Sequence, residues 1–125
     1  MHSLDVVDFS NEWIAAWNSH DLPRILSHYS DDFEMSSPYI AQIAGEPSGT
    51  LKGKLKVGAY WQNALQHFPR LHFELVEVLM GVSSLAMYYK SNVANRMVLE
   101  VLSLDEQGRI VRGHAHNSLS AEKPK

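Results

Sequence analysis

The chain of 125 residues contains no cysteine, so it has no thiol nucleophile or thiolate zinc ligand and cannot form a disulfide. Positive charge is also scarce, because 11 Lys and Arg residues stand against 14 Asp and Glu residues, which gives a formal net charge of -3. A nucleic-acid backbone is normally bound by clustered basic side chains. We therefore expect no nucleic-acid partner.

Long apolar runs are missing as well. No segment reaches the ~20 apolar residues of a membrane-spanning helix, and acidic residues interrupt the N-terminal segment where a signal peptide would be apolar. We expect no membrane association and a cytoplasmic location. The composition, 45% hydrophobic and 20% charged, is typical of a globular domain. We place a single domain at residues 1–120 and expect residues 121–125 to form a disordered tail.

Apolar residues recur at helical spacing in two segments of the first half, residues 4–17 and 54–67. Between these segments, Asp21 and Pro23 provide an N-cap and a proline in the first turn, which predicts a second, short helix from about Leu22 to residue 30. Asp31 and Asp32 are then expected to cap and turn the chain into a strand around Phe33. Residues 38–53 are rich in glycine and predict a loop with at most one brief strand.

Four apolar runs of strand length occupy the second half, and turn signals separate them at residues 81–84, 92–95 and 105–108. Connections this short join antiparallel neighbours. The sequence therefore predicts an α+β fold in which three N-terminal helices cover one face of a curved, mainly antiparallel sheet.

Three motifs occur in a characteristic order: W-N-x-x-D-L with Y-S-D-D-F near the start, G-K-x-x-V-G-x-Y-W in the middle, and D-E-x-G-R-I near the end. Together they resemble the nuclear transport factor 2-like superfamily, in its SnoaL-like and ketosteroid-isomerase-like branch. The resemblance covers nearly the whole chain. It implies a cystatin-like cone, with a cavity that the helices close at the wide end, and a homodimer formed through the outer sheet face.

In steroid-isomerase relatives a carboxylate base, a tyrosine and a protonated acid work together, and the resemblance maps these positions onto Ser37, Trp13 and Glu100. Serine cannot replace a carboxylate base, and an indole offers only a weaker N–H donor than a phenol. Ketosteroid isomerisation is therefore not expected. Glu100 is the candidate catalytic residue, because a carboxyl group in an apolar cavity has a raised pKa and can exchange protons near neutrality.

Two interpretations of Glu100 remain open from the sequence. Strand alternation alone favours a wetter face containing Val98, Glu100 and Leu102, with Met97 and Leu99 in the core. The resemblance instead turns Glu100 and Val98 toward the cavity.

The expected pocket is mostly aromatic, and its ligand is a flat or hydrophobic small molecule that carries a carbonyl group. Large aromatic residues at helical spacing are also typical of plain core. On the last strand the resemblance turns Val111, Gly113, Ala115 and Asn117 inward. Besides Glu100, the predicted pocket residues are Trp13, Trp17, Tyr29, Met35, Ser37, Tyr60, Trp61, Val98 and Asn117.

His114 and His116 form an H-x-H pair that points to one face of the last strand. Such a pair can bind a transition metal when a third ligand lies nearby. No third ligand is identifiable, and the resemblance turns both histidines outward, where an interface role fits better. We therefore predict no metal site, and no sequence motif indicates a cofactor.

Two hypotheses follow for function. The first is a cofactor-independent enzyme of isomerase, cyclase or hydratase type, with Glu100 as acid or base. The second is a non-catalytic ligand-binding or dimeric interaction module of the same fold.

Overall fold

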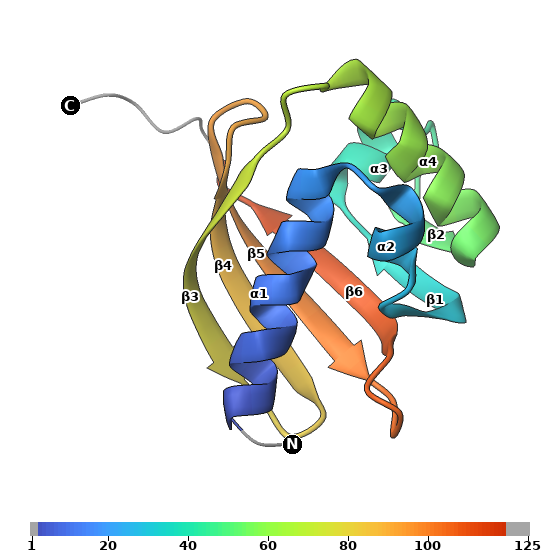
Figure 1. The fold of residues 1–125 in the computed structure, drawn as a ribbon. Helices are drawn as coiled ribbons and strands as arrows, with labels where there is room; N and C mark the ends of the chain where they lie inside the picture. Colours follow the sequence, from blue (N-terminus) through green and yellow to red (C-terminus); the bar gives the residue numbers. More distant parts are fainter. Residues whose placement is uncertain (1–2, 120–125) are drawn as a thin grey trace.

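A six-stranded curved sheet forms one wall of the molecule, with the strands in the order β2-β1-β6-β5-β4-β3 (Figure 1). The computed structural model describes residues 3–119, so the tail predicted at residues 121–125 lies outside the described part. The strands are β1 (Tyr29–Ser36), β2 (Thr50–Lys52), β3 (Phe73–Met80), β4 (Ser84–Ser91), β5 (Arg96–Leu104) and β6 (Ile110–Asn117).

The helices lie against the concave face of this sheet (Figure 1). They are α1 (Ser3–Ser19), α2 (Leu22–Leu26), α3 (Pro38–Ile43) and α4 (Lys54–His67). The α+β prediction is therefore confirmed. None of these helices, within residues 3–119, combines the length and the apolar character that crossing a membrane requires.

Helix α1 packs on β3 through one apolar stripe. Val6, Trp13, Ala16 and Trp17 are buried at spacings of three, four or seven residues, which is the period of one helix face. Asp21 lies between α1 and α2. Its side chain accepts a hydrogen bond from the backbone N–H of Arg24 at 3.3 Å, so it caps α2 as predicted.

Strands β3 to β6 form the predicted meander of antiparallel neighbours. The last strand, β6, lies beside β1 in parallel, and β2 pairs with the other edge of β1 in antiparallel fashion. Alternation then gives the sheet two different faces. Met87 and Tyr89 of β4 and Leu102 of β5 are buried against the helices, whereas the residues between them point to the outer face.

Two local predictions are wrong. Residues 38–43 form the short helix α3, because Ser37 caps it and Pro38 occupies its first position, two signals that the neighbouring glycines obscured. The predicted second helix ends at Leu26, and β1 begins at Tyr29. Asp31 and Asp32 consequently lie within β1 as exposed residues and cap no turn.

Candidate functional site

A cavity of about 260 Å³ lies between the helices and the inner face of the sheet. Its lining residues come from α1, α3 and α4 and from β1, β3, β4, β5 and β6. Every residue predicted for the pocket lines this cavity: Trp13, Trp17, Tyr29, Met35, Ser37, Tyr60, Trp61, Val98, Glu100 and Asn117.

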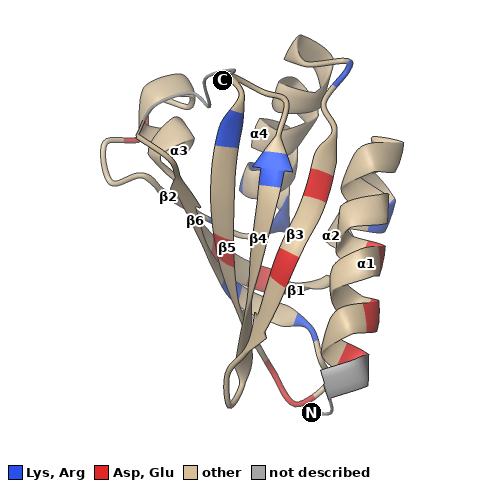
Figure 2. Cartoon of the chain, turned by 90° about the vertical axis from the view of Figure 1, so that its left-hand side faces the viewer, with Lys and Arg blue, Asp and Glu red and all other residues tan. Residues whose placement is uncertain are grey.

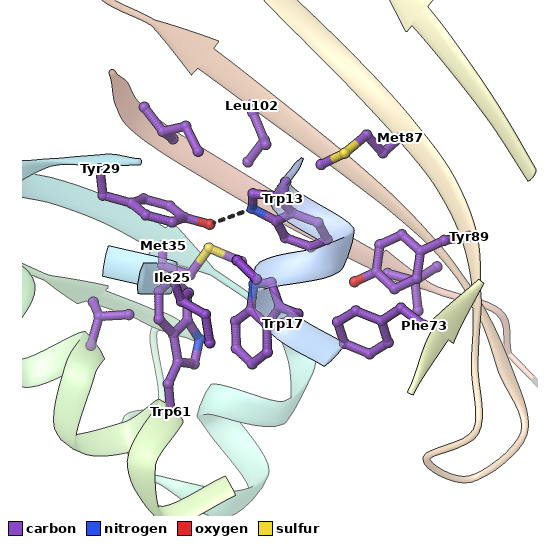
Figure 3. Close-up of a cluster of buried hydrophobic side chains, with 14 of the residues drawn as sticks. Trp13, Trp17, Ile25, Tyr29, Met35, Trp61, Phe73, Met87, Tyr89 and Leu102 are labelled. Atoms are coloured by element: carbon purple, nitrogen blue, oxygen red, sulfur yellow. Dashed lines mark hydrogen bonds between the residues drawn. The ribbon is translucent and has the colours of Figure 1, made fainter. Parts of the chain in front are cut away.

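Several of the residues that line the cavity are aromatic, and their rings pack on one another (Figure 3). Trp13 stacks on Phe73 with ring centroids 6.0 Å apart and an interplanar angle of 15°. Phe73 in turn lies 4.5 Å from the ring of Tyr89. On the other side, Trp17 meets Trp61 edge to face at 5.0 Å. Because these contacts fix several flat surfaces, the cavity is suited to a flat apolar ligand.

Glu100 is 5% exposed and stands in this apolar wall. Its Oε1 accepts a hydrogen bond from the hydroxyl of Tyr89 at 3.0 Å, and its Oε2 is buried without a partner. Burial raises the pKa of Glu100 to about 7, although the hydrogen bond from Tyr89 opposes the rise. A carboxyl group with this pKa is available both as an acid and as a base at neutral pH.

The position of Glu100 decides between the two interpretations of β5. Val98 and Leu102 are buried with it, whereas Met97 and Leu99 are only partly buried on the outer face. The wet-face interpretation is therefore wrong, and the inward-facing one is right.

A second phenol stands at the opposite side of the cavity. Trp13 Nε1 donates a hydrogen bond to the hydroxyl of Tyr29 at 3.0 Å (Figure 3). Burial raises the pKa of Tyr29, and the charge of Glu100 adds to the rise, while the indole N–H groups of Trp13 and Trp17 oppose it. Trp13, on α1, thus holds the phenol of Tyr29, which β1 supplies.

Ser37 lines the cavity, but its hydroxyl is committed to the backbone. Its Oγ accepts a hydrogen bond from Tyr39 N at 3.2 Å and caps α3. This contact agrees with the expectation that Ser37 is no proton-abstracting base.

Asn117 reaches the cavity from the last residue of β6. Its Nδ2 is buried without a hydrogen-bond partner. Val111, predicted to face inward, is instead exposed, and Ile110 is buried in its place. A register shift in the β5–β6 pairing at Ser103 and Leu104 accounts for this difference.

The histidine pair of β6 lies away from the cavity. His114 pairs with Val101 and His116 with Leu99, which places both on the outer face. Within residues 3–119, no group of three His, Asp or Glu side chains is arranged to hold a metal ion.

Tyr89 is the important residue that sequence reasoning missed. It shares a strand face with the buried Leu85 and Met87, so strand alternation could have indicated that Tyr89 points inward. Its contact with Glu100 depends on the β4–β5 register, in which Tyr89 lies opposite Val98. That register was not predicted.

Known proteins share both the sequence pattern and the fold. A family model described as SnoaL-like domain matches residues 11–113. A SnoaL-like protein of unknown function from Burkholderia thailandensis is 52% identical, with a TM-score of 0.90 over 94% of this chain and 97% of that one. No curated protein matches the chain.

More distant structures share the fold. A "putative polyketide cyclase" from Sinorhizobium meliloti has a TM-score of 0.73 at 14% identity, covering 93% of this chain and 100% of that one. A "putative isomerase of the SnoaL-like family" from Agrobacterium tumefaciens has a TM-score of 0.72 at 17% identity, covering 90% and 97%. At such identity the likeness is one of fold.

Proposed function

The chain belongs to the SnoaL-like domain family, and we propose that it binds a small hydrophobic carbonyl compound and moves a proton on it with Glu100. The supporting observation is a buried carboxyl group whose Oε2 has no partner, in the wall of an apolar cavity. The proposed activity is of isomerase, cyclase or lyase type and needs no cofactor. The isomerase and cyclase names of two similar structures agree with it.

The proposed chemistry is a proton transfer beside the carbonyl group. Ionised Glu100 takes a proton from the neighbouring carbon onto Oε2, and the electron pair moves to the carbonyl oxygen as an enolate. The amide N–H of Asn117 is positioned in the same wall to stabilise that oxygen. Return of the proton to the same or another carbon completes exchange or isomerisation.

Deuterium exchange tests this proposal without knowledge of the natural substrate. The probe is 2-tetralone, a two-ring ketone, in D₂O, with loss of the proton signal next to the carbonyl followed by NMR. We expect the protein to accelerate exchange, with a rate that rises with pH and levels off above about 7, because the base must be ionised.

The variant Glu100→Gln keeps the size of the side chain and removes the base, so acceleration should fall roughly 100-fold or more. Glu12→Gln is the matched control, because Glu12 does not line the cavity, and it should exchange like the wild type. Equal rates for the wild type and Glu100→Gln contradict the proposal. Tight binding without acceleration would favour the non-catalytic alternative.

The alternative of a dimeric interaction module also has structural support, and we propose that the outer sheet face forms a homodimer in either case. Leu79 is 53% exposed and Tyr88 38% exposed on this face, next to the half-buried Leu99 and Val101. Strands β4 and β5 carry few charged residues (Figure 2), and on this face the acidic Glu77 of β3 lies opposite Tyr88.

Light scattering on a sizing column tests the dimer. Leu99→Glu should convert it to a monomer, because a carboxylate would be buried in an apolar interface. Val82→Glu is the control, since Val82 is 97% exposed in the β3–β4 turn. A monomeric wild type contradicts the proposed dimer and leaves the cavity chemistry intact.

A further inference from the structure

The cavity opens where some of its lining residues reach the surface. Ile43 of α3 is 53% exposed, Phe68 after α4 is 38% exposed, and Ala94 is exposed in the turn between β4 and β5. The rim of the mouth is therefore formed by α3, by the segment that follows α4 and by the β4–β5 turn. A ligand whose body lies in the apolar interior presents its outer end to these three segments.

Two of the three segments are joined by Asn92 of the β4–β5 turn. Its Nδ2 donates a hydrogen bond to the carbonyl oxygen of Arg70 at 2.8 Å, and its Oδ1 accepts one from the backbone N–H of His72 at 2.8 Å. Arg70 lies between Phe68 and Leu71, which both line the cavity. These contacts fix the backbone of Arg70 beside the turn, so its charged side chain belongs to the rim of the mouth.

Arg96 follows the same turn and lies on the inner face of the sheet. It pairs with Ser91, which lines the cavity, and residues directly opposite on antiparallel strands share a face. Arg96 also shares the strand alternation of Val98 and Glu100, which are buried on the inner face. Arg96 does not line the cavity itself. The register therefore places a second guanidinium group at the rim, beside Ser91.

Neither of these two arginines is neutralised by an acid. Within residues 3–119, no carboxylate lies within ion-pair distance of Arg70 or Arg96. Arg70 is exposed, whereas Arg96 is half-buried, with Nη1 donating to the carbonyl oxygen of Ser118 at 2.8 Å and Nε buried without a partner. A guanidinium group keeps its charge and presents a planar set of donors that matches a carboxylate. The rim of the mouth is therefore suited to an anionic group.

The acid of the cavity stands apart from this rim. Among the described residues that line the cavity, Glu100 carries the one carboxyl group. It lies four residues along β5 from Arg96, a separation of roughly 13 Å at the usual rise of a strand. A negative charge at the rim is thus held away from ionised Glu100. The cavity is polar at its mouth and apolar within, so a matching ligand has one charged end.

We infer that the ligand of this cavity is an amphipathic carboxylic acid, with its apolar rings in the interior and its carboxylate at the mouth, between Arg70 and Arg96. The inference rests on the proposed function and narrows its substrate class to hydrophobic carbonyl compounds that carry a negative charge at the end remote from Glu100. Arg70 and Arg96 then select the ligand by its charge. Arg96 contributes more, because a half-buried guanidinium group is less screened by water and salt than an exposed one.

Two probes of nearly equal size test selection by charge. They are naphthalene-2-acetic acid and naphthalene-2-acetamide, which share a two-ring body, and only the acid is charged near pH 7. Calorimetry in about 50 mM salt should show the acid binding about tenfold more tightly, and about 0.5 M salt should reduce this preference. All three tryptophans line the cavity, so shifts of their indole N–H signals in the NMR spectrum show that the acid occupies it.

Substitutions at the mouth test which charges are responsible. In Arg96→Gln the preference for the acid should fall to about threefold or less, because the charge and the planar set of donors are lost. Arg70→Gln should give a smaller fall, and this exposed position keeps the inference testable should Arg96→Gln not fold. Arg109→Gln is the matched control. It makes the same change in net charge at an exposed position in the β5–β6 turn, at the other end of β5, and should keep the full preference.

The failures of this inference and of the proposed function are distinguishable. Equal affinity for the two probes, no binding of either, indole signals that the acid does not shift, or a preference that both mouth variants retain overturns the inference. An equal fall in Arg109→Gln also overturns it, since net charge alone then explains the preference. In each case, accelerated exchange of 2-tetralone still supports the proposed function. A preference that depends on Arg96 without any exchange supports selection by charge and contradicts the proton transfer.

Discussion

Two glutamates show how differently the same side chain behaves in two regions of this molecule. Glu12 lies on α1 with its side chain 40% exposed, and Arg24 donates to it from Nη2 at 2.6 Å and from Nε at 3.1 Å. His28 Nε2 lies 3.0 Å from the same carboxylate. The hydrogen bond from Arg24 is the main cause that lowers the pKa of Glu12.

Glu100 has the opposite surroundings. It is buried in the wall of a mostly apolar cavity, it has one neutral partner in Tyr89, and burial raises its pKa to about 7. The comparison shows that the surroundings of a carboxyl group decide whether it serves as a fixed charge or as a proton donor and acceptor. Glu12 stays charged and links α1 to Arg24 of α2 and to His28, which directly precedes β1. Glu100 instead retains a proton that it can exchange.

The largest predicted effect on stability concerns Glu100. Its pKa of about 7 in the folded state lies above the value of 4.5 expected when unfolded, so ionisation disfavours folding. Between pH 4 and pH 8 the free energy of unfolding of Glu100→Gln should therefore increase relative to the wild type by about 3 kcal/mol. Urea denaturation across this range measures the change. A difference that does not vary with pH contradicts the assigned burial.

Tyr89→Phe should lower the free energy of unfolding, whereas Glu100→Gln should raise it relative to the wild type at high pH, and the effect of Tyr89→Phe should be smaller. The change removes the hydrogen bond that holds down the pKa of Glu100, so this pKa should rise above 7. It also leaves Oε1 unsatisfied, which should reduce the free energy of unfolding by about 1–3 kcal/mol, more at pH 8 than at pH 5. Denaturation at both pH values measures the loss. Tyr88→Phe is the control, because Tyr88 lies on the outer face, and an equal loss there would remove Tyr89 from this role.

Glu12→Gln should have the smallest effect on stability. Because the pKa of Glu12 is lowered by folding, its contribution is present above pH 4.5 and is lost as the pH falls through the folded value. Because the side chain of Glu12 is partly exposed, Glu12→Gln should lower the free energy of unfolding by less than ~1 kcal/mol at pH 7, and salt should reduce this loss further. A double-mutant cycle with Arg24→Gln measures the coupling. A coupling that does not weaken in 1 M salt contradicts this description of the pair.

Much of the architecture follows from local sequence patterns. The helical stripes of α1 and α4 and the short turns of the second half specify the helices and the antiparallel meander. The face of Glu100 did not follow from alternation, because Leu99 and Val101 on the outer face are as apolar as Val98 and Leu102 on the inner one. The family resemblance favoured the inward-facing interpretation without deciding it, and the burial of Glu100 and Val98 in the structure resolved the ambiguity.

The contacts of the site that the sequence did not predict join segments that lie far apart in the chain. Trp13 and Tyr29 are joined by the fold of α1 against β1, and Tyr89 reaches Glu100 through strand register. The boundary at Tyr29 was predicted incorrectly because Ile25, Leu26 and Tyr29 also have helical spacing. Pairing across the sheet overrides that local preference.

Site-resolved NMR titration of the glutamate side-chain carboxyl carbons tests the central claim most directly. The claim is that Glu100 exchanges its proton close to neutral pH inside the cavity, while Glu12 remains a charged surface residue. In protein labelled with ¹³C at glutamate, we expect Glu100 to titrate near pH 7 and Glu12 below 4.5. Assignment uses the loss of one signal in Glu100→Gln and of the other in Glu12→Gln. Titration of Glu100 near 4.5 would contradict the account.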